Sequence, residues 1–145
     1  MWKSPIAFLL IAAAIGLAPI AEARIYDRCS LARELQILGV PRYELSSWIC
    51  IAERESTYNS YAVGPPNWDG SHDYGIFQIN DKYWCAPPSG AFSHNLCKIN
   101  CNDLLSDSIA ADLQCARLIL REQGWKAWSV WQYCNNALPY IDDCF

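Results

Sequence analysis

Glu55 and Asp73, eighteen positions apart, are the residues of this sequence whose types best suit acid–base chemistry. Glu55 lies near the end of a predicted helix with apolar and aromatic neighbours, where partial desolvation would raise its pKa. Asp73 lies among polar residues such as Ser71 and Asn80, whose hydrogen bonds would favour the ionised form. One protonated and one ionised carboxyl group is the combination that hydrolysis of a glycosidic bond requires.

The spacing of the two carboxyl groups is weak support by itself. The chain has fifteen acidic residues, so it offers many Glu/Asp pairs, and most such groups are solvated on protein surfaces. Glu53, on the same predicted helix, is an alternative to Glu55 that residue type alone leaves open. The elements that surround the two residues must therefore show whether they form a functional pair.

Hydrophobic periodicity predicts three helices and one short strand. The helices are expected over residues 29–39, over 44–56, and from 108 to a stop at Gly124. The aromatic and β-branched run 74–80 is typical of a strand, and turn-forming residues surround it. The order of helices, small sheet and returning helix predicts an α+β fold with a cleft between two lobes.

The second predicted helix has an apolar stripe that would face the core. Leu45, Trp48, Ile49 and Ala52 recur at intervals of three and four residues along it. We therefore assign Trp48 to the core and not to a binding surface.

The N-terminus has the pattern of a signal peptide over residues 1–23. Lys3 precedes an apolar run, and Ala21-Glu22-Ala23 fits the small-residue rule for signal-peptidase cleavage. The apolar run is shorter than the roughly 20 residues of a membrane-spanning helix, which disfavours the alternative of a membrane anchor. We expect a secreted, extracellular chain of residues 24–145, of a length that suits one domain.

Eight cysteines lie in the predicted mature chain. An even number in a small secreted protein implies four disulfides, which could form in 105 ways. Zinc binding by Cys97 and Cys101 is the alternative, but the chain has only two histidines and no CxxC pair. We therefore expect disulfides and no bound metal.

The charge of the chain excludes a general attraction to nucleic acid. Without residues 1–23 the sequence keeps ten basic and fourteen acidic residues, a net charge of −4. No basic stripe is present, so nucleic acid is not an expected partner.

The residues around the carboxyl pair closely resemble the C-type lysozyme family. The resemblance rests on Glu55-Ser56, on Asp69-Gly70-Ser71-His72, on the run Asp73-Tyr74-Gly75-Ile76-Phe77-Gln78-Ile79-Asn80, and on Tyr83-Trp84-Cys85. It covers essentially the whole predicted mature chain, including the order of all eight cysteines. Among the members, the chain is most similar to the acidic, digestive insect lysozymes.

The resemblance implies a fold, an activity and roles for individual residues. It implies a lysozyme-like fold with an α lobe (24–59 and 106–145), a β lobe (60–105) and a cleft between them. The implied activity is hydrolysis of the β-1,4 bond between N-acetylmuramic acid and N-acetylglucosamine in peptidoglycan. Glu55 would be the general acid, and Asp73 the nucleophile or electrostatic stabiliser, of a retaining mechanism.

The same resemblance implies the disulfide pairing and the residues of the substrate groove. The implied disulfides are Cys29–Cys144, Cys50–Cys134, Cys85–Cys101 and Cys97–Cys115. The implied substrate-binding residues are Gln78, Asn80, Tyr83, Trp84, Ala127 and Trp128. Trp128 would also pack on Glu55 and help raise its pKa. For an arbitrary aromatic residue, core packing would be the better interpretation than sugar binding.

Some family members bind calcium through three clustered aspartates, and the matching positions here argue against a metal. They are Ser106, Ala111 and Asp112, which retain one carboxylate. We therefore predict no structural calcium and no cofactor. The expected partners are peptidoglycan and chitooligosaccharides, bound by a monomer.

The acidic charge favours a working compartment of low pH. A chain of net charge −4 is repelled by anionic cell walls at neutral pH, whereas below its isoelectric point of about 5.0 it becomes positive. This pattern favours bacterial digestion, with antibacterial defence as the other possible role. Two other classes stay open as alternatives: a non-catalytic glycan-binding or regulatory relative, and a membrane-disrupting protein. The retained carboxyl pair disfavours the first, and the lack of a basic amphipathic helix disfavours the second.

Overall fold

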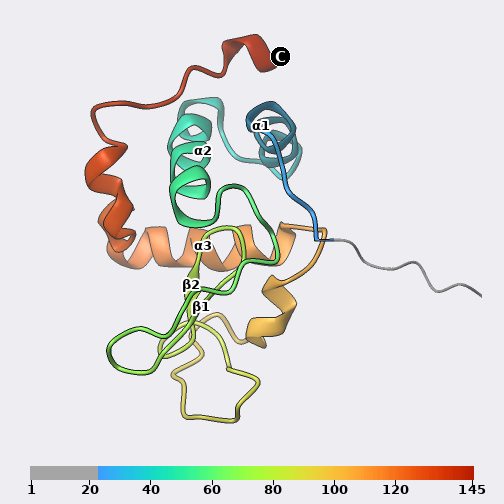
Figure 1. Ribbon diagram of the computed structural model, residues 1–145. Helices are drawn as coiled ribbons and strands as arrows, with labels where there is room; N and C mark the ends of the chain where they lie inside the picture. Colours follow the sequence, from blue (N-terminus) through green and yellow to red (C-terminus); the bar gives the residue numbers. More distant parts are fainter. Residues whose placement is uncertain (1–22) are drawn as a thin grey trace, which may run out of the picture.

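The computed structural model describes residues 23–145 (Figure 1). The predicted signal peptide thus lies almost entirely outside the described residues. Among those that are described, no helix has the length and apolar character needed to cross a membrane.

Two helices open the fold at the positions that the sequence predicts. Helix α1 (Arg28–Ile37) begins after Asp27, whose side chain accepts hydrogen bonds from the backbone N–H groups of Cys29 and Ser30. Helix α2 (Arg42–Ser56) ends where Thr57 takes a left-handed conformation, at φ 52°. The predicted apolar stripe of α2, Trp48 included, is fully buried.

The predicted strand over 74–80 is instead a hairpin. Strands β1 (Asp73–Tyr74) and β2 (Ile79–Asn80) pair antiparallel, with Asp73 opposite Asn80. The chain reverses between them because Gly75 and Gln78 have positive φ, and the side chain of Gln78 donates hydrogen bonds to the Ala62 and Gly75 carbonyls. The alternation of β-forming residues conceals a turn that only positive φ permits.

The helical character after residue 108 is helix α3 (Ala110–Gln123), which stops at Gly124 with φ 74°. Within residues 23–145, four short 3-10 helices follow the regular elements or lie between them: η1 (Cys101–Leu104), η2 (Trp125–Ala127), η3 (Ser129–Tyr133) and η4 (Asp142–Cys144). In Figure 1, α1 and α2 stand above α3, and the hairpin with its long loops lies below it. The fold is α+β, with a helical lobe and a small antiparallel sheet lobe.

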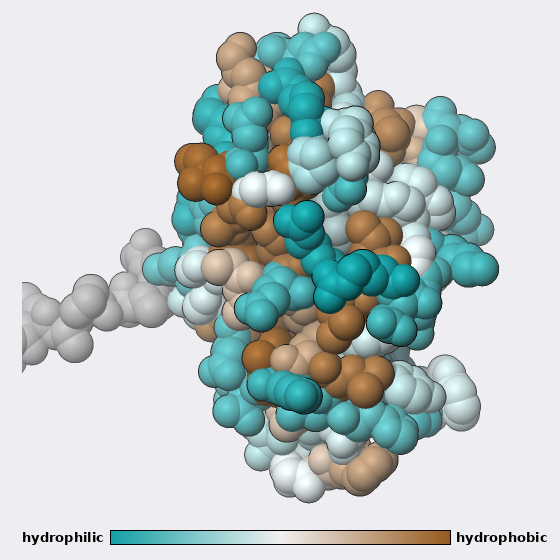
Figure 2. All heavy atoms as spheres, turned by 180° about the vertical axis from the view of Figure 1, so that it is seen from behind, coloured by the Kyte–Doolittle hydropathy of each residue, from teal (hydrophilic) through white to brown (hydrophobic). Residues whose placement is uncertain are grey.

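The core runs through both lobes without interruption. Its centre is Trp48, whose ring contacts Phe77 of the hairpin turn, Trp125 and Trp128 at centroid distances of 4.8–5.4 Å. Such contacts add to the stability that burial of large aromatic rings already provides. At the surface, apolar residues form several separate patches between hydrophilic ones, as the face in Figure 2 shows.

Four disulfides tie distant segments together in the pairing that the family resemblance implied. Cys29–Cys144 joins α1 to the C-terminal η4, and Cys50–Cys134 joins α2 to the end of η3. Cys85–Cys101 and Cys97–Cys115 fasten the long loop of the sheet lobe to η1 and α3. Cross-links between distant segments stabilise the fold, mainly because they restrict the unfolded chain.

Helix α3 meets the hairpin at a buried carboxyl group. Asp112 is fully buried, and its Oδ1 accepts a hydrogen bond of 3.3 Å from the Ile76 backbone N–H. Burial raises the pKa of Asp112 to about 8, so the group is neutral over most of the physiological range. A Cβ added at Gly75 would collide with this Oδ1 and come within 2.6 Å of the Leu104 carbonyl oxygen.

We therefore expect Gly75→Ala to destabilise the protein by about 3 kcal/mol or more, through combined overpacking and backbone strain. Gly90→Ala is the matched control, since Gly90 has the same φ of 76° but nothing within 4 Å of the added Cβ. The control should cost only about 1 kcal/mol. Urea unfolding of both variants measures the difference, and equal losses would contradict the close packing at Gly75.

Candidate active site

Glu55 is held at the last turn of α2, against the hairpin. Its neighbour Ser56 donates a hydrogen bond of 2.8 Å to the Ile76 carbonyl and also bonds the Ala52 carbonyl. The end of the helix is thereby joined to the turn that follows Asp73. Glu55 is half-buried, whereas Glu53 is exposed. The structure thus separates the two glutamates that residue type left open.

Asp73 is surrounded by amide and hydroxyl groups. Asn80 donates a hydrogen bond of 2.9 Å to one carboxylate oxygen, and Asn67 donates one of 3.1 Å to the other. The Ser71 hydroxyl oxygen accepts from the same two amides and so fixes their orientation. Donors aimed at both oxygens favour a carboxylate in its ionised form. The sequence pointed to Ser71 and Asn80 but missed Asn67, which belongs to the preceding loop.

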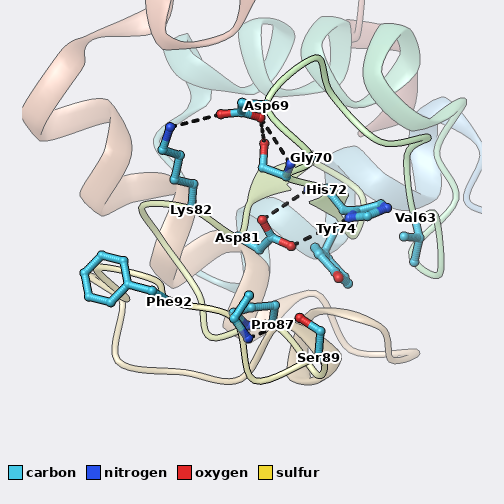
Figure 3. Close-up of a pocket in the computed structure, with 12 residues that line it drawn as sticks. Val63, Asp69, Gly70, His72, Tyr74, Asp81, Lys82, Pro87, Ser89 and Phe92 are labelled. Carbon is cyan, nitrogen blue, oxygen red and sulfur yellow. Dashed lines mark hydrogen bonds and ion pairs between the residues drawn. The ribbon is translucent and has the colours of Figure 1, made fainter.

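Glu55 and Asp73 line the same pocket, of about 200 Å³, between the two lobes. Of the residues that the resemblance implied, all but one line it as well: Gln78, Asn80, Trp84, Ala127 and Trp128. Tyr83 does not line the pocket, and this residue is 46% exposed to solvent. Four other residues line the pocket without having been predicted as site residues: Ile79, which belongs to the quoted motif, and Ile119, Gln123 and Ser129, which had no signal in the sequence. A larger concavity, of about 590 Å³, lies elsewhere on the sheet lobe and contains neither carboxyl group (Figure 3).

The apolar wall of the pocket is built around Trp128. This residue is 5% exposed, and its indole N–H donates a buried hydrogen bond of 2.9 Å to the Phe77 carbonyl. The bond crosses from the helical lobe to the hairpin turn. Trp128 is therefore fixed in orientation, with its ring packed on Trp48.

The two acids of the pocket have unequal environments. Burial, and secondly the nearby negative charge of Asp73, raise the pKa of Glu55 from 4.5 to about 7. Asp73 has two amide donors, and Glu55 makes no side-chain hydrogen bond among those found in the described residues. Glu55 can hold a proton near neutral pH and release it to a substrate, while Asp73 presents a carboxyl group whose two oxygens are both fixed by hydrogen bonds.

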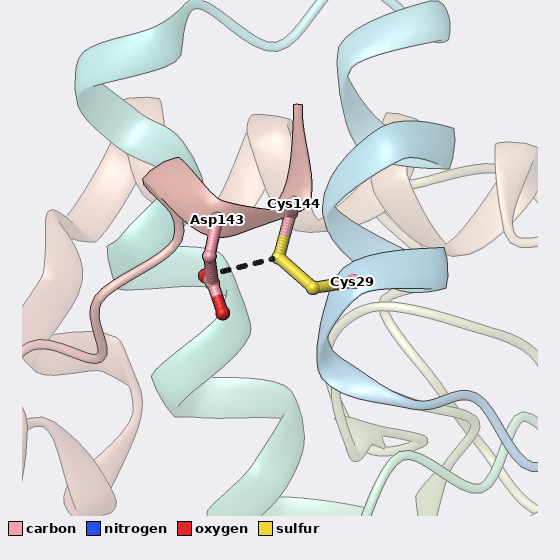
Figure 4. A group of neighbouring side chains, drawn as sticks. All are labelled: Cys29, Asp143 and Cys144. Carbon is pink, nitrogen blue, oxygen red and sulfur yellow. Dashed lines mark hydrogen bonds between the residues drawn. A yellow bond between two sulfur atoms is a disulfide. The ribbon is translucent and has the colours of Figure 1, made fainter.

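No convincing metal site is found among the described residues. The one group of three candidate ligand side chains there is Cys29, Asp143 and Cys144 (Figure 4). Its two sulfur atoms are bonded to each other, so they are not free thiolates. The prediction that the chain binds no structural calcium remains a prediction.

Comparisons with known proteins identify the family to which this fold belongs. The model of the C-type lysozyme/alpha-lactalbumin family matches residues 24–144. Lysozyme 2 of Lucilia sericata is 61% identical over 137 residues, covering 94% of this chain and 96% of the relative. Lysozyme B of Drosophila melanogaster is 58% identical over 136 residues, covering 94% and 97%.

The solved structures that this chain resembles are also lysozymes. The canine milk lysozyme structure in its apo form has a TM-score of 0.73 and 38% identity, covering 80% of this chain and 92% of its own. The lysozyme of Equus asinus has a TM-score of 0.76 and 34% identity, covering 84% and 99%. The chain belongs to the C-type lysozyme/alpha-lactalbumin family. It is an enzyme of the glycoside hydrolase class, as its lysozyme relatives are.

The pKa of Glu55 gives a direct test of the electrostatics. We expect Asp73→Asn to lower this pKa below about 7, because a neighbouring negative charge is removed. The pKa should stay above the ordinary 4.5, because burial is the larger cause and is unchanged. NMR titration of the carboxyl carbon measures it. A return to 4.5 would mean that charge, and not burial, sets the value.

Proposed function

We propose that the protein is a lysozyme that hydrolyses the β-1,4 bond between N-acetylmuramic acid and N-acetylglucosamine in bacterial peptidoglycan. The observation that carries the proposal is the contrast between Glu55 and Asp73 in one pocket. Glu55 has a pKa raised to about 7, whereas Asp73 accepts hydrogen bonds at both oxygens. Close relatives that bear the name lysozyme support the same activity.

In the proposed mechanism the two acids act on opposite sides of the scissile bond. Glu55 donates its proton to the glycosidic oxygen as the bond to the sugar carbon breaks, and so becomes a carboxylate. Asp73 stabilises the positive charge that develops on the sugar or forms a covalent bond to the same carbon. A water molecule then gives its proton to Glu55 and adds to this carbon with retention of configuration, which restores both acids.

The remaining pocket residues would bind the sugar. Trp84 and Trp128 offer aromatic surface. The amide N–H groups of Gln78 and Asn80 already donate within the sheet lobe, so these two side chains would offer their amide oxygens as acceptors. Ala127, in η2, also lines the pocket and would contribute its backbone. Chitooligosaccharides, which carry the same acetamido groups, would be a second class of substrate.

The proposed setting is extracellular and acidic. Residues 1–23 would direct secretion, and the mature chain would act as a monomer. The net charge of −4 at neutral pH and the isoelectric point of about 5.0 favour contact with anionic walls in an acidic compartment. Bacterial digestion suits such a compartment, and antibacterial defence is compatible with the same chemistry.

Replacement of the proposed acid tests the catalytic roles. Glu55→Gln should lower the rate of cell-wall lysis by about 10²–10⁴-fold, because the variant has no proton to donate. Glu53→Gln is the control. Glu53 lies two residues before Glu55 on α2 and is exposed, so this variant should retain activity. Turbidity of a bacterial-wall suspension gives the rate. Equal clearing by wild type and Glu55→Gln would reject the assignment, and glycan binding without cleavage by the wild type would favour a non-catalytic relative.

The pH dependence of lysis is a separate prediction. Because the acid must be protonated, activity should fall as the pH rises through about 7, the pKa of Glu55. Repulsion between the acidic chain and anionic walls adds to this decline at low salt. Rates measured from pH 4 to 8, at two salt concentrations, give the profile. Fastest lysis at neutral pH and low salt would contradict the acidic setting.

A further inference from the structure

A buried carboxyl group that the proposed mechanism does not use lies behind the candidate active site. Asp112, in the first turn of α3, is 0% exposed, and its Oδ2 has no hydrogen-bond partner among residues 23–145. Burial of an unpaired polar atom lowers the stability of a fold. A role in packing alone therefore does not explain why a carboxyl group occupies this position.

The fold makes room for this carboxyl group and gives its other oxygen a partner. Oδ1 of Asp112 accepts a hydrogen bond of 3.3 Å from the backbone N–H of Ile76, in the turn between β1 and β2. Gly75, the preceding residue, leaves the space that Oδ1 needs, because a Cβ at that position would collide with it. The carboxyl group is thus aimed at the turn, and its hydrogen bond joins α3 to the hairpin.

The backbone of Ile76 is also held at its carbonyl oxygen. The Ser56 hydroxyl donates a hydrogen bond of 2.8 Å to this oxygen, and Ser56 directly follows Glu55 in the last turn of α2. A continuous link therefore runs from α3 to α2 through one residue of the turn. It ends one position from the proposed catalytic acid.

We propose that Asp112 is a positioning residue for Glu55. Through Ile76 and Ser56 it holds the end of α2 against the hairpin, so that the Glu55 side chain stays half-buried in the pocket. The acceptor oxygen of Asp112, and not a charge, does the positioning, so an amide would serve as well. The inference rests on the proposed function, in which Glu55 is the acid.

The test replaces the acceptor with an apolar group of similar shape, and the hexamer of N-acetylglucosamine is the substrate. Asp112→Leu should lower kcat by about 10- to 100-fold, because small displacements of a catalytic group slow the reaction strongly. KM should change by less than about three-fold, since the residues that bind sugar are unaltered. The pKa of Glu55, followed by NMR of its carboxyl carbon, should fall below about 7, because water gains access to the group.

Two variants on α3 control for general effects of substitution. Asp112→Asn keeps an acceptor oxygen and should retain both kcat and the pKa of Glu55. Gln114→Leu makes a similar polar-to-apolar change at an exposed position of the same helix and should also retain them. Losses in either control that equal those of Asp112→Leu would overturn the proposal.

Ser56→Ala tests the other end of the link and decides the matter if Asp112→Leu does not fold. It removes the donor to Ile76, so it should also lower kcat and the pKa of Glu55. In the double variant the loss of kcat should be smaller than the product of the two single losses, because both residues act through Ile76. An unchanged pKa of Glu55 in Ser56→Ala, or in a folded Asp112→Leu, would overturn the link.

The two readouts separate this inference from the proposed function. NMR titration of Glu55 requires no cleavage, so it tests the positioning even in a protein without activity. Absence of hexamer and cell-wall cleavage by the wild type would reject the proposed function. A lowered pKa of Glu55 in Asp112→Leu would still support the link through Ile76.

Discussion

The hydrogen bond from the Trp128 indole to the Phe77 carbonyl is the contact on which the candidate site depends most. It is buried, measures 2.9 Å and joins the C-terminal helical segment to the turn between β1 and β2. If either partner were lost, the other would be left buried and unsatisfied, at a cost of about 1–3 kcal/mol. Trp48 packs against both residues, so the hydrogen bond and the aromatic core support each other.

This contact also links the stability of the fold to the chemistry of the site. The two lobes meet there, and the apolar wall it fixes belongs to the same pocket as Glu55. Burial, which keeps water away from the charged form of the carboxyl group, is the larger cause of the raised pKa of Glu55. The packing that stabilises the junction is therefore the same packing that keeps a proton on the acid.

The helices were predictable because their signals are local. The period of the α2 stripe, the cap at Asp27 and the stop at Gly124 each lie within a few residues of the feature that they define. The hairpin was not, because the run 74–80 has the composition of one strand and its turn depends on a contact with α3. Asp112, which makes that contact, lies 36 residues from Ile76. A local sequence pattern cannot predict a hydrogen-bond partner that is so far away in the chain.

The residues of the candidate site also fall into two groups, those that the sequence predicted and those that only the structure identifies. Family resemblance to a short motif brought Glu55, Asp73 and most of the pocket residues together, whereas residue types and spacing alone left Glu53 as an equal choice. Asn67 and Ile119 reach the site from segments outside the motif, so only the three-dimensional structure identifies them. Tyr83 lies outside the pocket lining, and its ring stacks on that of His94, eleven residues further along the chain; its role in sugar binding stays a prediction.

The buried Asp112 carboxyl has a consequence for tolerance of acid. Groups whose folded pKa is raised, such as Asp112 and Glu55, bind protons more tightly in the native state than in the unfolded chain. Between about pH 4 and pH 7–8 they therefore make the native state more stable as the pH falls. Asp69 acts in the opposite direction, because its hydrogen bonds lower its pKa to about 2, but that loss occurs only below about pH 4. The two windows do not overlap, so these groups together place the greatest conformational stability near pH 4. A fluid of about pH 4 is therefore the setting in which these three groups most favour the folded over the unfolded chain.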